Sequence, residues 1–249
     1  MKSGSDPDFA MIDLHCHLLP GIDDGPETLE EALEMARIAV ANGIEEAHVT
    51  PHLHVGRWDN DLQKINAAVE SYRAALAQAG IPLVIGFAAE VRLDYEIVPL
   101  IEAGRVPFLG TLEGHQVMLL EFPHSHVPVG ADKFVAWLLA RNIRPLIAHP
   151  ERNKDVMRDP GRIEPFVREG CLLQLTADSV SGGFGELCAQ RAREFLERGW
   201  VSVLASDAHD TVDRPPRIAP GRDAAAVIVG EDEARRMTHD TPLRIVRGT

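Results

Sequence analysis

The chain has 249 residues, of which 45% are hydrophobic and 25% charged, a composition typical of globular proteins. Its formal net charge of −13 at pH 7 disfavours a nucleic-acid partner, because a phosphate backbone would be repelled. No apolar run approaches the roughly 20 residues of a membrane span, so we expect no membrane insertion.

Three cysteines, Cys16, Cys171 and Cys188, lack the spacing of a disulfide framework. Their odd number favours a reducing compartment, so we expect a cytoplasmic protein. The polar segment 1–10 lacks the apolar stretch of a signal peptide and is interpreted as a flexible leader. The length of the remainder fits one α/β barrel, and residues 11–249 are expected to form a single domain.

The predicted elements alternate between short apolar runs and amphipathic runs. The strand 11–17 is followed by a helix, 28–43, in which Thr28 is the expected N-cap and Glu31 completes a capping box. The Asn-Gly pair at 42–43 is the expected stop signal of this helix. The later elements, in chain order, are strand 47–52, helix 61–80, strands 83–91 and 116–123, helix 133–142, strand 145–151, helix 161–170, strand 171–177, helix 186–199 and strand 201–209.

Apolar strands that alternate with helices favour an α/β fold with buried parallel strands and helices outside them. Nearly every predicted strand ends in a metal-capable or acidic side chain. In a parallel barrel, the carboxyl ends of all strands emerge on one face, where active sites lie, so these residues would converge there. They are His15, His17, His52, Glu90, Glu121, His149, Asp207 and His209.

The first strand shows the simplest part of this pattern. His15 and His17 are two residues apart and therefore point to the same face of a strand, with Asp13 behind them in the row. Two solvated histidines at a strand end would explain this pair equally well when it is taken alone.

The full set of five histidines and three carboxylates is too large for one ion and suits two or three, with carboxylates as bridges. Mixed nitrogen and oxygen ligands favour Zn, Mn or Fe over Ca. Multinuclear sites of this kind hydrolyse phosphate esters and amides.

Several short motifs resemble the PHP (polymerase and histidinol phosphatase) superfamily. The resemblance is greatest to its bacterial protein tyrosine phosphatases of capsule and exopolysaccharide synthesis. The motifs lie within residues 11–215 and are DLHCHLLPGIDDG, TPH, AAE, LLEFP, IAHPERN, QLTADSVSGGFG and ASDAHD. The HxH opening is shared by many amidohydrolases, whereas HPERN and GIDDG are far more specific.

The resemblance implies a distorted (β/α)7 TIM-like barrel, the PHP fold, and three divalent metal ions, often Mn²⁺, with Fe or Zn as alternatives. The implied ligands are the same eight residues that the strand ends indicate. Arg152 and Arg214 are implied to bind phosphate, and Arg217 would replace or support Arg214. The implied partner is a phosphotyrosine protein, specifically a bacterial tyrosine kinase of polysaccharide synthesis.

Such a phosphatase would use metal-activated water, with the two arginines as bidentate donors to the phosphoryl group. Asp207 or His209 would protonate the leaving oxygen, a role left open because both are also candidate ligands. A thiol mechanism is excluded, because no cysteine is followed six residues later by arginine. The alternatives are a small-molecule phosphatase of histidinol-phosphate type, a metal-dependent amidase and a non-catalytic metal-holding scaffold.

Other polar and aromatic residues have secondary interpretations. Asp13 is expected to orient a ligating histidine, while Asp23 and Asp24 either do the same or cap the following turn. The aromatic ring of the substrate is expected to rest on the rim near residues 54–58, which include Trp58. The remaining histidines are expected as follows: His54 at the rim, His124 and His126 at the mouth with substrate contact the less favoured role, and His48, His115 and His239 in solvated or core positions.

Overall fold

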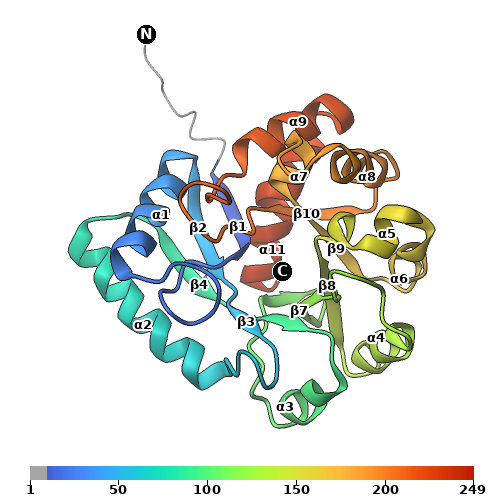
Figure 1. Ribbon diagram of the computed structural model, residues 1–249, viewed down its shortest axis with the longest axis horizontal. Coiled ribbons are helices and arrows are strands. Elements are labelled where there is room, and N and C mark those ends of the chain that lie inside the picture. Colours follow the sequence, from blue (N-terminus) through green and yellow to red (C-terminus); the bar gives the residue numbers. More distant parts are fainter. Residues whose placement is uncertain (1–9) are drawn as a thin grey trace.

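The computed structural model describes residues 10–249, which form the α/β fold predicted from the sequence (Figure 1). The predicted leader, 1–10, lies outside the described residues except for its last position. That residues 11–249 form one domain stays a prediction. Within the described part of the chain, no helix combines the length and apolar character that crossing a membrane requires.

The strands coincide closely with the apolar runs of the sequence. They are β1 (Met11–Cys16), β2 (Ile44–Val49), β3 (His52–Leu53), β4 (Val84–Phe87), β5 (Glu90–Arg92), β6 (Gly110–Leu112), β7 (His115–Glu121), β8 (Ile143–Ala148), β9 (Leu172–Thr176) and β10 (Val201–Ala205). The predicted strands 47–52 and 83–91 are each interrupted, which gives β2 with β3 and β4 with β5.

The strands pair into two ladders. One has the order β1-β2-β4 and the other β10-β9-β8-β7-β5-β3, all parallel, while β6 is antiparallel to β7. Two backbone hydrogen bonds continue the pairing of the β2–β3 and β4–β5 segments through the interruptions. Ala88 N–H donates to the Val49 carbonyl (3.0 Å), and Glu90 N–H donates to the Pro51 carbonyl (3.2 Å).

The first and last strands meet at their carboxyl ends. Asp207 N–H donates to the His15 carbonyl (2.7 Å), and His17 N–H donates to the Ala208 carbonyl (2.9 Å). Cys16 also forms a parallel bridge with Ala208. These contacts bring β1 beside β10 on the face where the predicted ligands lie, so the expected distorted barrel is confirmed.

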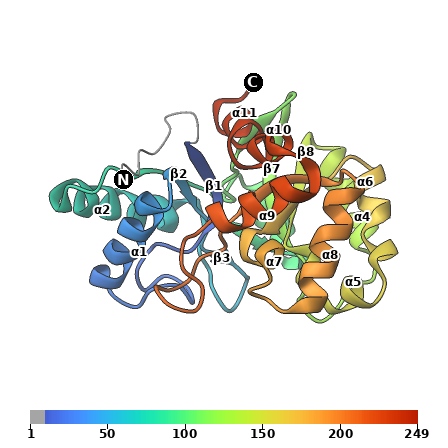
Figure 2. The ribbon, with the colours of Figure 1, turned by 90° about the horizontal axis from the view of Figure 1, so that it is seen from above.

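The helices lie outside the strands (Figures 1 and 2). They are α1 (Leu29–Ala41), α2 (Leu62–Ala79), α3 (Val98–Glu102), α4 (Ala131–Leu139), α5 (Lys154–Arg158), α6 (Glu164–Arg168), α7 (Ala177–Ser181), α8 (Glu186–Glu197), α9 (Ala219–Val229), α10 (Glu231–Arg235) and α11 (Thr241–Arg247). The five predicted helices correspond to α1, α2, α4, α6 and α8. The others, and β6, have no predicted counterpart, because most of them are short.

The predicted start of α1 is confirmed. The hydroxyl of Thr28 accepts a hydrogen bond from Glu31 N–H (3.2 Å), and the carboxylate of Glu31 accepts one from Glu27 N–H (3.2 Å). The Thr28 hydroxyl thus satisfies a backbone donor that the first turn of the helix leaves free. Glu31 instead accepts from the residue before the N-cap, so the predicted capping box is not formed in its usual pattern.

The interior of the ring of strands is filled by apolar side chains that point inward from the strands. They include Ile12 and Leu14 of β1, Val117 and Leu119 of β7, Leu146 of β8 and Val203 of β10, together with Ile245 of α11. Helix α11 lies at the end of the ring from which the strands begin (Figure 2). Gly110 permits its close approach, because a Cβ at this position would lie 2.1 Å from the Ile245 carbonyl oxygen.

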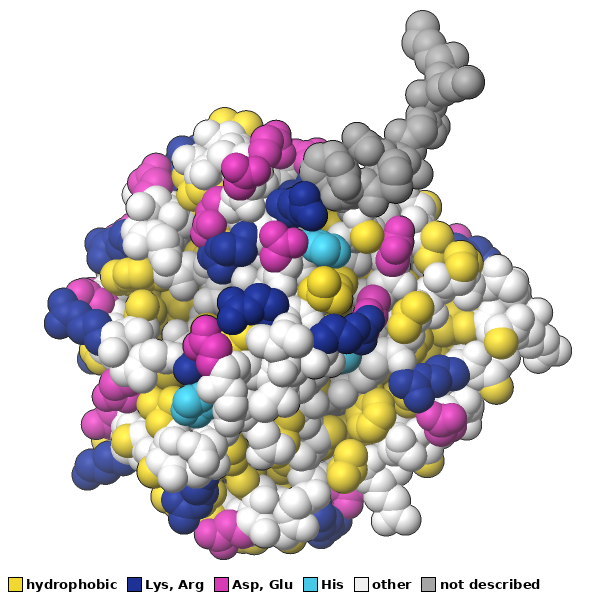
Figure 3. All heavy atoms as spheres, turned by 180° about the vertical axis from the view of Figure 1, so that it is seen from behind, with side chains coloured by type: hydrophobic (Ala, Val, Ile, Leu, Met, Phe, Trp, Pro, Cys, Tyr) yellow, Lys and Arg dark blue, Asp and Glu magenta, His cyan; other side chains and the backbone are white. Residues whose placement is uncertain are grey.

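Polar side chains of β2 also face α11. His48 is buried, as one of its two predicted roles required, and its Nε2 lies 3.0 Å from the Glu46 carboxylate. Arg247 pairs with the other oxygen of Glu46 (2.7 Å). On the outer surface of this end, basic and acidic side chains lie beside one another (Figure 3), and Glu113 pairs with both Arg144 and Arg244.

The end of α1 is tied to the start of α9 through Asn42, the predicted stop residue. Asn42 is the C-cap of α1, and Gly43 follows it with φ of 89°. The side-chain oxygen of Asn42 accepts hydrogen bonds from Ile218 N–H (2.7 Å) and Ala219 N–H (3.0 Å). One amide therefore caps the helix that follows the site loops.

We expect Asn42→Ala to lower the free energy of unfolding by about 1–2 kcal/mol, because two backbone donors at the start of α9 lose their acceptor. Chemical denaturation measures this change. Asn66→Ala, at an exposed position of α2, is the matched control and should leave stability nearly unchanged. Equal effects of the two substitutions would contradict the capping role of Asn42.

Candidate metal centre

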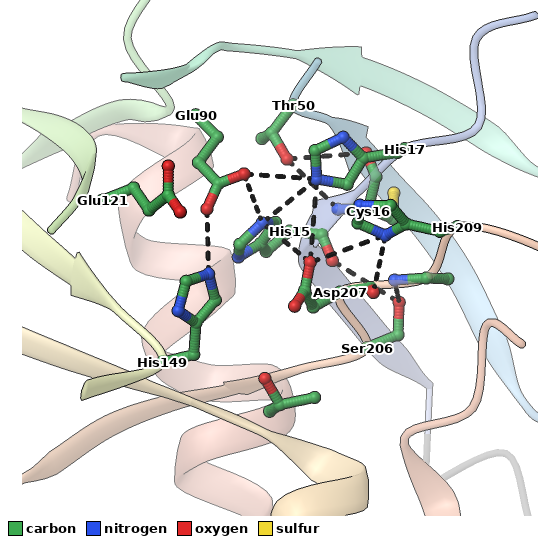
Figure 4. Close-up of polar contacts among 12 residues, drawn as sticks. His15, Cys16, His17, Thr50, Glu90, Glu121, His149, Ser206, Asp207 and His209 are labelled. Atoms are coloured by element: carbon green, nitrogen blue, oxygen red, sulfur yellow. Dashed lines mark hydrogen bonds and ion pairs between the residues drawn. The ribbon is translucent and has the colours of Figure 1, made fainter. Parts of the chain in front are cut away.

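All eight side chains predicted as metal ligands lie together at the carboxyl face of the fold, and Figure 4 labels all of them except His52. Two of them, His52 and Glu90, begin the short strands β3 and β5 rather than ending a strand. They fall into overlapping groups whose ligand atoms lie within 4.8 Å of one another. The groups are His17, Asp24, His52 and His209; His15, Glu90 and His149; His15, His17 and Asp207; and His52, Glu90 and Glu121. Residues 15 and 209, at opposite ends of the chain, thus share one site.

The carboxylate of Glu90 lies at the centre of this cluster. Its Oε2 is 3.3 Å from His15 Nε2, 3.3 Å from His17 Nε2 and 2.9 Å from His52 Nδ1. None of these contacts has hydrogen-bond geometry, although the oxygen is buried. Three ring nitrogens therefore surround one buried carboxylate oxygen without a hydrogen bond to it, and bound cations would give these atoms ligand bonds. These residues fit a divalent metal ion.

The electrostatics of the site favour positive charge. Burial opposes ionisation of Glu90, but His15 and His52 hold the pKa of its carboxyl well below its usual range. Burial also opposes a charged imidazole at His52, yet Glu90 and Asp24 raise the pKa of His52 to about 11. The pKa of His17 rises to about 9, because the Asp23 carboxylate outweighs the effect of burial.

Two side chains orient the first pair of histidines. His15 Nδ1–H donates to Gln174 Oε1 (2.9 Å), and His17 Nδ1–H donates to Asp23 Oδ2 (2.6 Å). Each bond turns Nε2 of its ring toward Glu90, and such partners fix the tautomer of a ligating histidine. Asp23 fills both of the roles considered, because its Oδ1 also accepts a hydrogen bond from Gly25 N–H (3.1 Å) in the following turn. Gln174 was not predicted as a site residue, although it is the first residue of the motif QLTADSVSGGFG.

The role expected for Asp13 is wrong. Its carboxylate accepts hydrogen bonds from Ser206 N–H (3.0 Å), from His15 N–H (3.2 Å) and from the Ser206 hydroxyl (2.5 Å), and it has no hydrogen bond with an imidazole ring. The register of β1 against β2 shifts between Asp13 and Cys16. This irregularity breaks the alternation of side chains that placed Asp13 in one row with the histidines.

Asp24 is a candidate ligand that the sequence analysis did not identify as such. Its Oδ1 lies 3.3 Å from His52 Nε2 and 3.5 Å from His209 Nε2. The side chain is 46% exposed and extends from the loop after β1 into the mouth of the site. The acidic pair in GIDDG was the available signal, but a capping role explained it equally well.

Both predicted phosphate-binding arginines lie beside the cluster. Arg152 and Arg214 donate to the same oxygen of Asp207, Oδ2, and for Arg214 the distance is 2.5 Å. Arg152 also donates to the Thr176 hydroxyl (3.4 Å), while Nε of Arg214 is buried and has no partner. Arg217 is exposed and does not line the cavity, so the structure does not bring it to the site.

These groups surround a cavity of about 320 Å³ that opens at the carboxyl face. It is lined by Asp24, His52, Glu90, Glu121, His124, His149, Arg152, Asp207, His209 and Arg214. Each of these side chains is charged or is an imidazole. The cavity therefore suits metal ions and an anion, and none of its lining side chains is aliphatic or a phenyl ring.

Of the remaining histidines, His124 lines the cavity, whereas His126 is exposed and contacts Ser125. His54 is half-buried, and its backbone forms an antiparallel β-bridge with Trp58. His115 and His239 are partly buried away from the site. Trp58 stacks on His52, with ring centroids 4.7 Å apart and an interplanar angle of 11°. The aromatic residue expected to hold the substrate ring thus packs against a candidate ligand.

Two candidate ligands adopt the left-handed backbone conformation. His149 has φ of 32° and Asp207 has φ of 51°. This conformation costs of order 1–3 kcal/mol for a residue other than glycine and is maintained where the surroundings impose it. Here Asp207 N–H is held by the His15 carbonyl, and the His149 carbonyl accepts from Arg152 N–H (3.0 Å).

Proteins of known activity resemble this chain in sequence. Residues 11–247 match the family described as capsular polysaccharide synthesis, CpsB/CapC. The tyrosine-protein phosphatase YwqE of Bacillus subtilis (strain 168) is 33% identical over 204 residues, which cover 82% of this chain and 79% of YwqE. The tyrosine-protein phosphatase CpsB of Streptococcus pneumoniae is 29% identical over 245 residues, which cover 95% of this chain and 98% of CpsB.

The fold is also similar to a crystal structure from a study of YwqE and CpsB, described there as unique metal-dependent tyrosine phosphatases. The TM-score is 0.88 at 30% identity, and the match covers 96% of this chain and 95% of that structure. The predicted resemblance to this branch of the PHP superfamily is thereby confirmed. The chain belongs to the CpsB/CapC family of capsular polysaccharide synthesis.

Proposed function

We propose that this protein is a metal-dependent tyrosine phosphatase whose substrate is a tyrosine kinase of capsule or exopolysaccharide synthesis. The observation that supports this most is the convergence of eight ligand-capable side chains beside two arginines in one polar cavity. The names of its relatives YwqE and CpsB support the same activity. We propose further that it acts in the cytoplasm, which three free, buried cysteines favour.

We propose that the site binds three divalent metal ions, with Mn²⁺ as the first candidate and Fe or Zn as alternatives. The proposed ligands are the eight predicted residues together with Asp24. Mixed imidazole and carboxylate donors suit these metals. When bound, the ions would neutralise the phosphate dianion and supply an activated water.

The protein's own contribution is to bind and orient the phosphoryl group. Arg152 and Arg214 present planar donors to one side of the cavity, and Asp207 holds both at a single oxygen. His209 is positioned by Nδ1–H, which donates to the Asp207 carbonyl (3.0 Å), so its Nε2 faces Asp24. A phenolate is a good leaving group, and protonation by Asp207 or His209 is a secondary part of this proposal.

The alternatives are less well supported. A small-molecule phosphatase of histidinol-phosphate type would use the same metals, but the curated relatives are named tyrosine-protein phosphatases. A scaffold would not require a complete set of ligands, and an amidase would not require two arginines beside them. Relative turnover of a phosphotyrosine peptide and histidinol phosphate separates the first alternative from the main proposal.

Metal analysis tests the cofactor directly. We expect purified protein to contain two to three equivalents of transition metal, chelation to abolish phosphatase activity, and Mn²⁺ to restore it. Glu90→Gln should lose metal and reduce turnover by on the order of 10²-fold or more, because its carboxylate faces four imidazoles. Glu96→Gln, at an exposed position, is the control. Full activity of metal-free protein would refute the mechanism.

Substitution of the arginines tests the phosphate site. Arg152→Ala and Arg214→Ala should each lower turnover by on the order of 10²–10³ while metal content and fold are kept, because each removes a donor to the transferring phosphoryl group. Lysine at either position should restore activity in part, since it lacks the planar fork. Arg158→Ala, exposed on α5, is the control. Parent-like kinetics of both alanine variants would favour an amidase or scaffold.

The cysteines provide a third test. Burial raises the pKa of Cys171 to about 12 and raises that of Cys16 well above its usual value, whereas a nucleophilic cysteine needs a low pKa. Cys171→Ser and Cys188→Ser should therefore keep most of the turnover on p-nitrophenyl phosphate. Loss of activity in either variant with its metals still bound would contradict a metal-based mechanism.

A further inference from the structure

One connection on the carboxyl face is built almost entirely of glycine around a single aromatic residue. Between α7 and α8, residues 182–185 read Gly-Gly-Phe-Gly. Gly182 has φ of 97° and ends α7, and Gly185 has φ of 88°. These values favour glycine at both positions. Phe184 is the one side chain that it presents.

Phe184 does not belong to the hydrophobic core. Among the phenylalanines that the structure describes, it is the one that neither belongs to nor packs against either apolar cluster. Its ring is half-buried, and its aromatic contact is with Arg152, whose guanidinium carbon lies 4.3 Å from the ring centroid. This distance is that of a cation–π contact. Core packing therefore does not explain the presence of this ring.

The position of Phe184 matters because of what the cavity lacks. The ten side chains that line the cavity are charged groups or imidazoles, and none of them is an aliphatic or phenyl side chain. Trp58, the other aromatic residue beside the cavity, is stacked on His52 and has the Arg57 guanidinium 3.9 Å from its ring centroid. An aryl group that leaves the cavity next to Arg152 would meet the ring of Phe184.

We propose that Phe184 is the surface on which the aromatic ring of an aryl phosphate packs, and that it makes the site prefer aryl over alkyl phosphates. This inference rests on the proposed phosphatase function. In phosphotyrosine one oxygen separates the ring from phosphorus, so a phosphoryl group bound at Arg152 brings the substrate ring close to that guanidinium. A contact between two aromatic rings contributes about 0.5–1.5 kcal/mol beyond the area that it buries.

The test uses the variants Phe184→Leu, which keeps an apolar side chain over Arg152, and Phe184→Tyr, which keeps the ring. We expect Phe184→Leu to raise KM for a phosphotyrosine peptide by about three- to tenfold. The inhibition constant of inorganic phosphate, and KM for the same peptide carrying phosphoserine, should change less than twofold. Phe184→Tyr should resemble the parent. Leu187→Ala, an exposed apolar residue on α8, is the matched control.

Two results would overturn the inference. One is an unchanged KM for the phosphotyrosine peptide in Phe184→Leu. The other is an equal rise in KM and in the inhibition constant of phosphate, because Phe184 would then act only by positioning Arg152.

A binding measurement separates this inference from the proposed function. By calorimetry, the metal-loaded parent should bind phenylphosphonate more tightly than methylphosphonate, and Phe184→Leu should lose that preference. A parent that shows the preference but hydrolyses no phosphotyrosine peptide would refute the proposed function and leave the inference intact. Hydrolysis without the preference would refute the inference alone.

Discussion

The buried carboxylate of Glu90 is the group on which the geometry of the site depends. Four imidazoles from three strand ends approach its two oxygens within 3.3 Å. An ionised carboxylate in this position is costly unless positive charge surrounds it. That positive charge can come from protons on the imidazoles or from divalent cations. Because the imidazoles and Glu90 belong to different strands, a cation bound between them would also stabilise the packing of those strands. The stability of the fold at this end therefore depends on the positive charge around Glu90.

Asp207 links this cluster to the anion-binding side of the cavity. Its Oδ1 lies 3.2 Å from His15 Nε2, and its Oδ2 accepts from Arg152 and Arg214. The left-handed backbone at this residue directs the carboxylate between the two groups, while its N–H holds β1 against β10. One residue thus orients two guanidinium groups relative to the candidate metal ligands.

The two ends of the ring have opposite character. At the amino end, Ile245 of α11 completes an apolar interior, and Arg247 pairs with the partly buried Glu46. At the carboxyl end, every side chain that lines the cavity is a charged group or an imidazole. This division confines ions to one face of the fold and leaves recognition of an aromatic substrate to the surrounding loops.

The sequence by itself determined the features that follow from local chemistry. The N-cap of α1, the apolar strands and the eight strand-end side chains could be predicted, because strand alternation and the shared direction of parallel strands are short-range rules. Arg152 was indicated in a different way, by the family resemblance of the motif HPERN. Arg217 could not be separated from Arg214 in this way, since neighbouring loop residues follow no such rule.

Only the tertiary structure decided which partners those side chains meet. Gln174 orients His15 from 159 residues away, Asp24 reaches the mouth of the site, and a register shift in β1 removes Asp13 from the ligand row. The roles of Phe184 and α11 likewise depend on the residues that surround them in the folded chain, Arg152 for Phe184 and the strands for α11. A polar or aromatic residue has the same local pattern whether it faces solvent, core or a neighbouring ligand, because its environment is set by distant segments that the folded chain brings together.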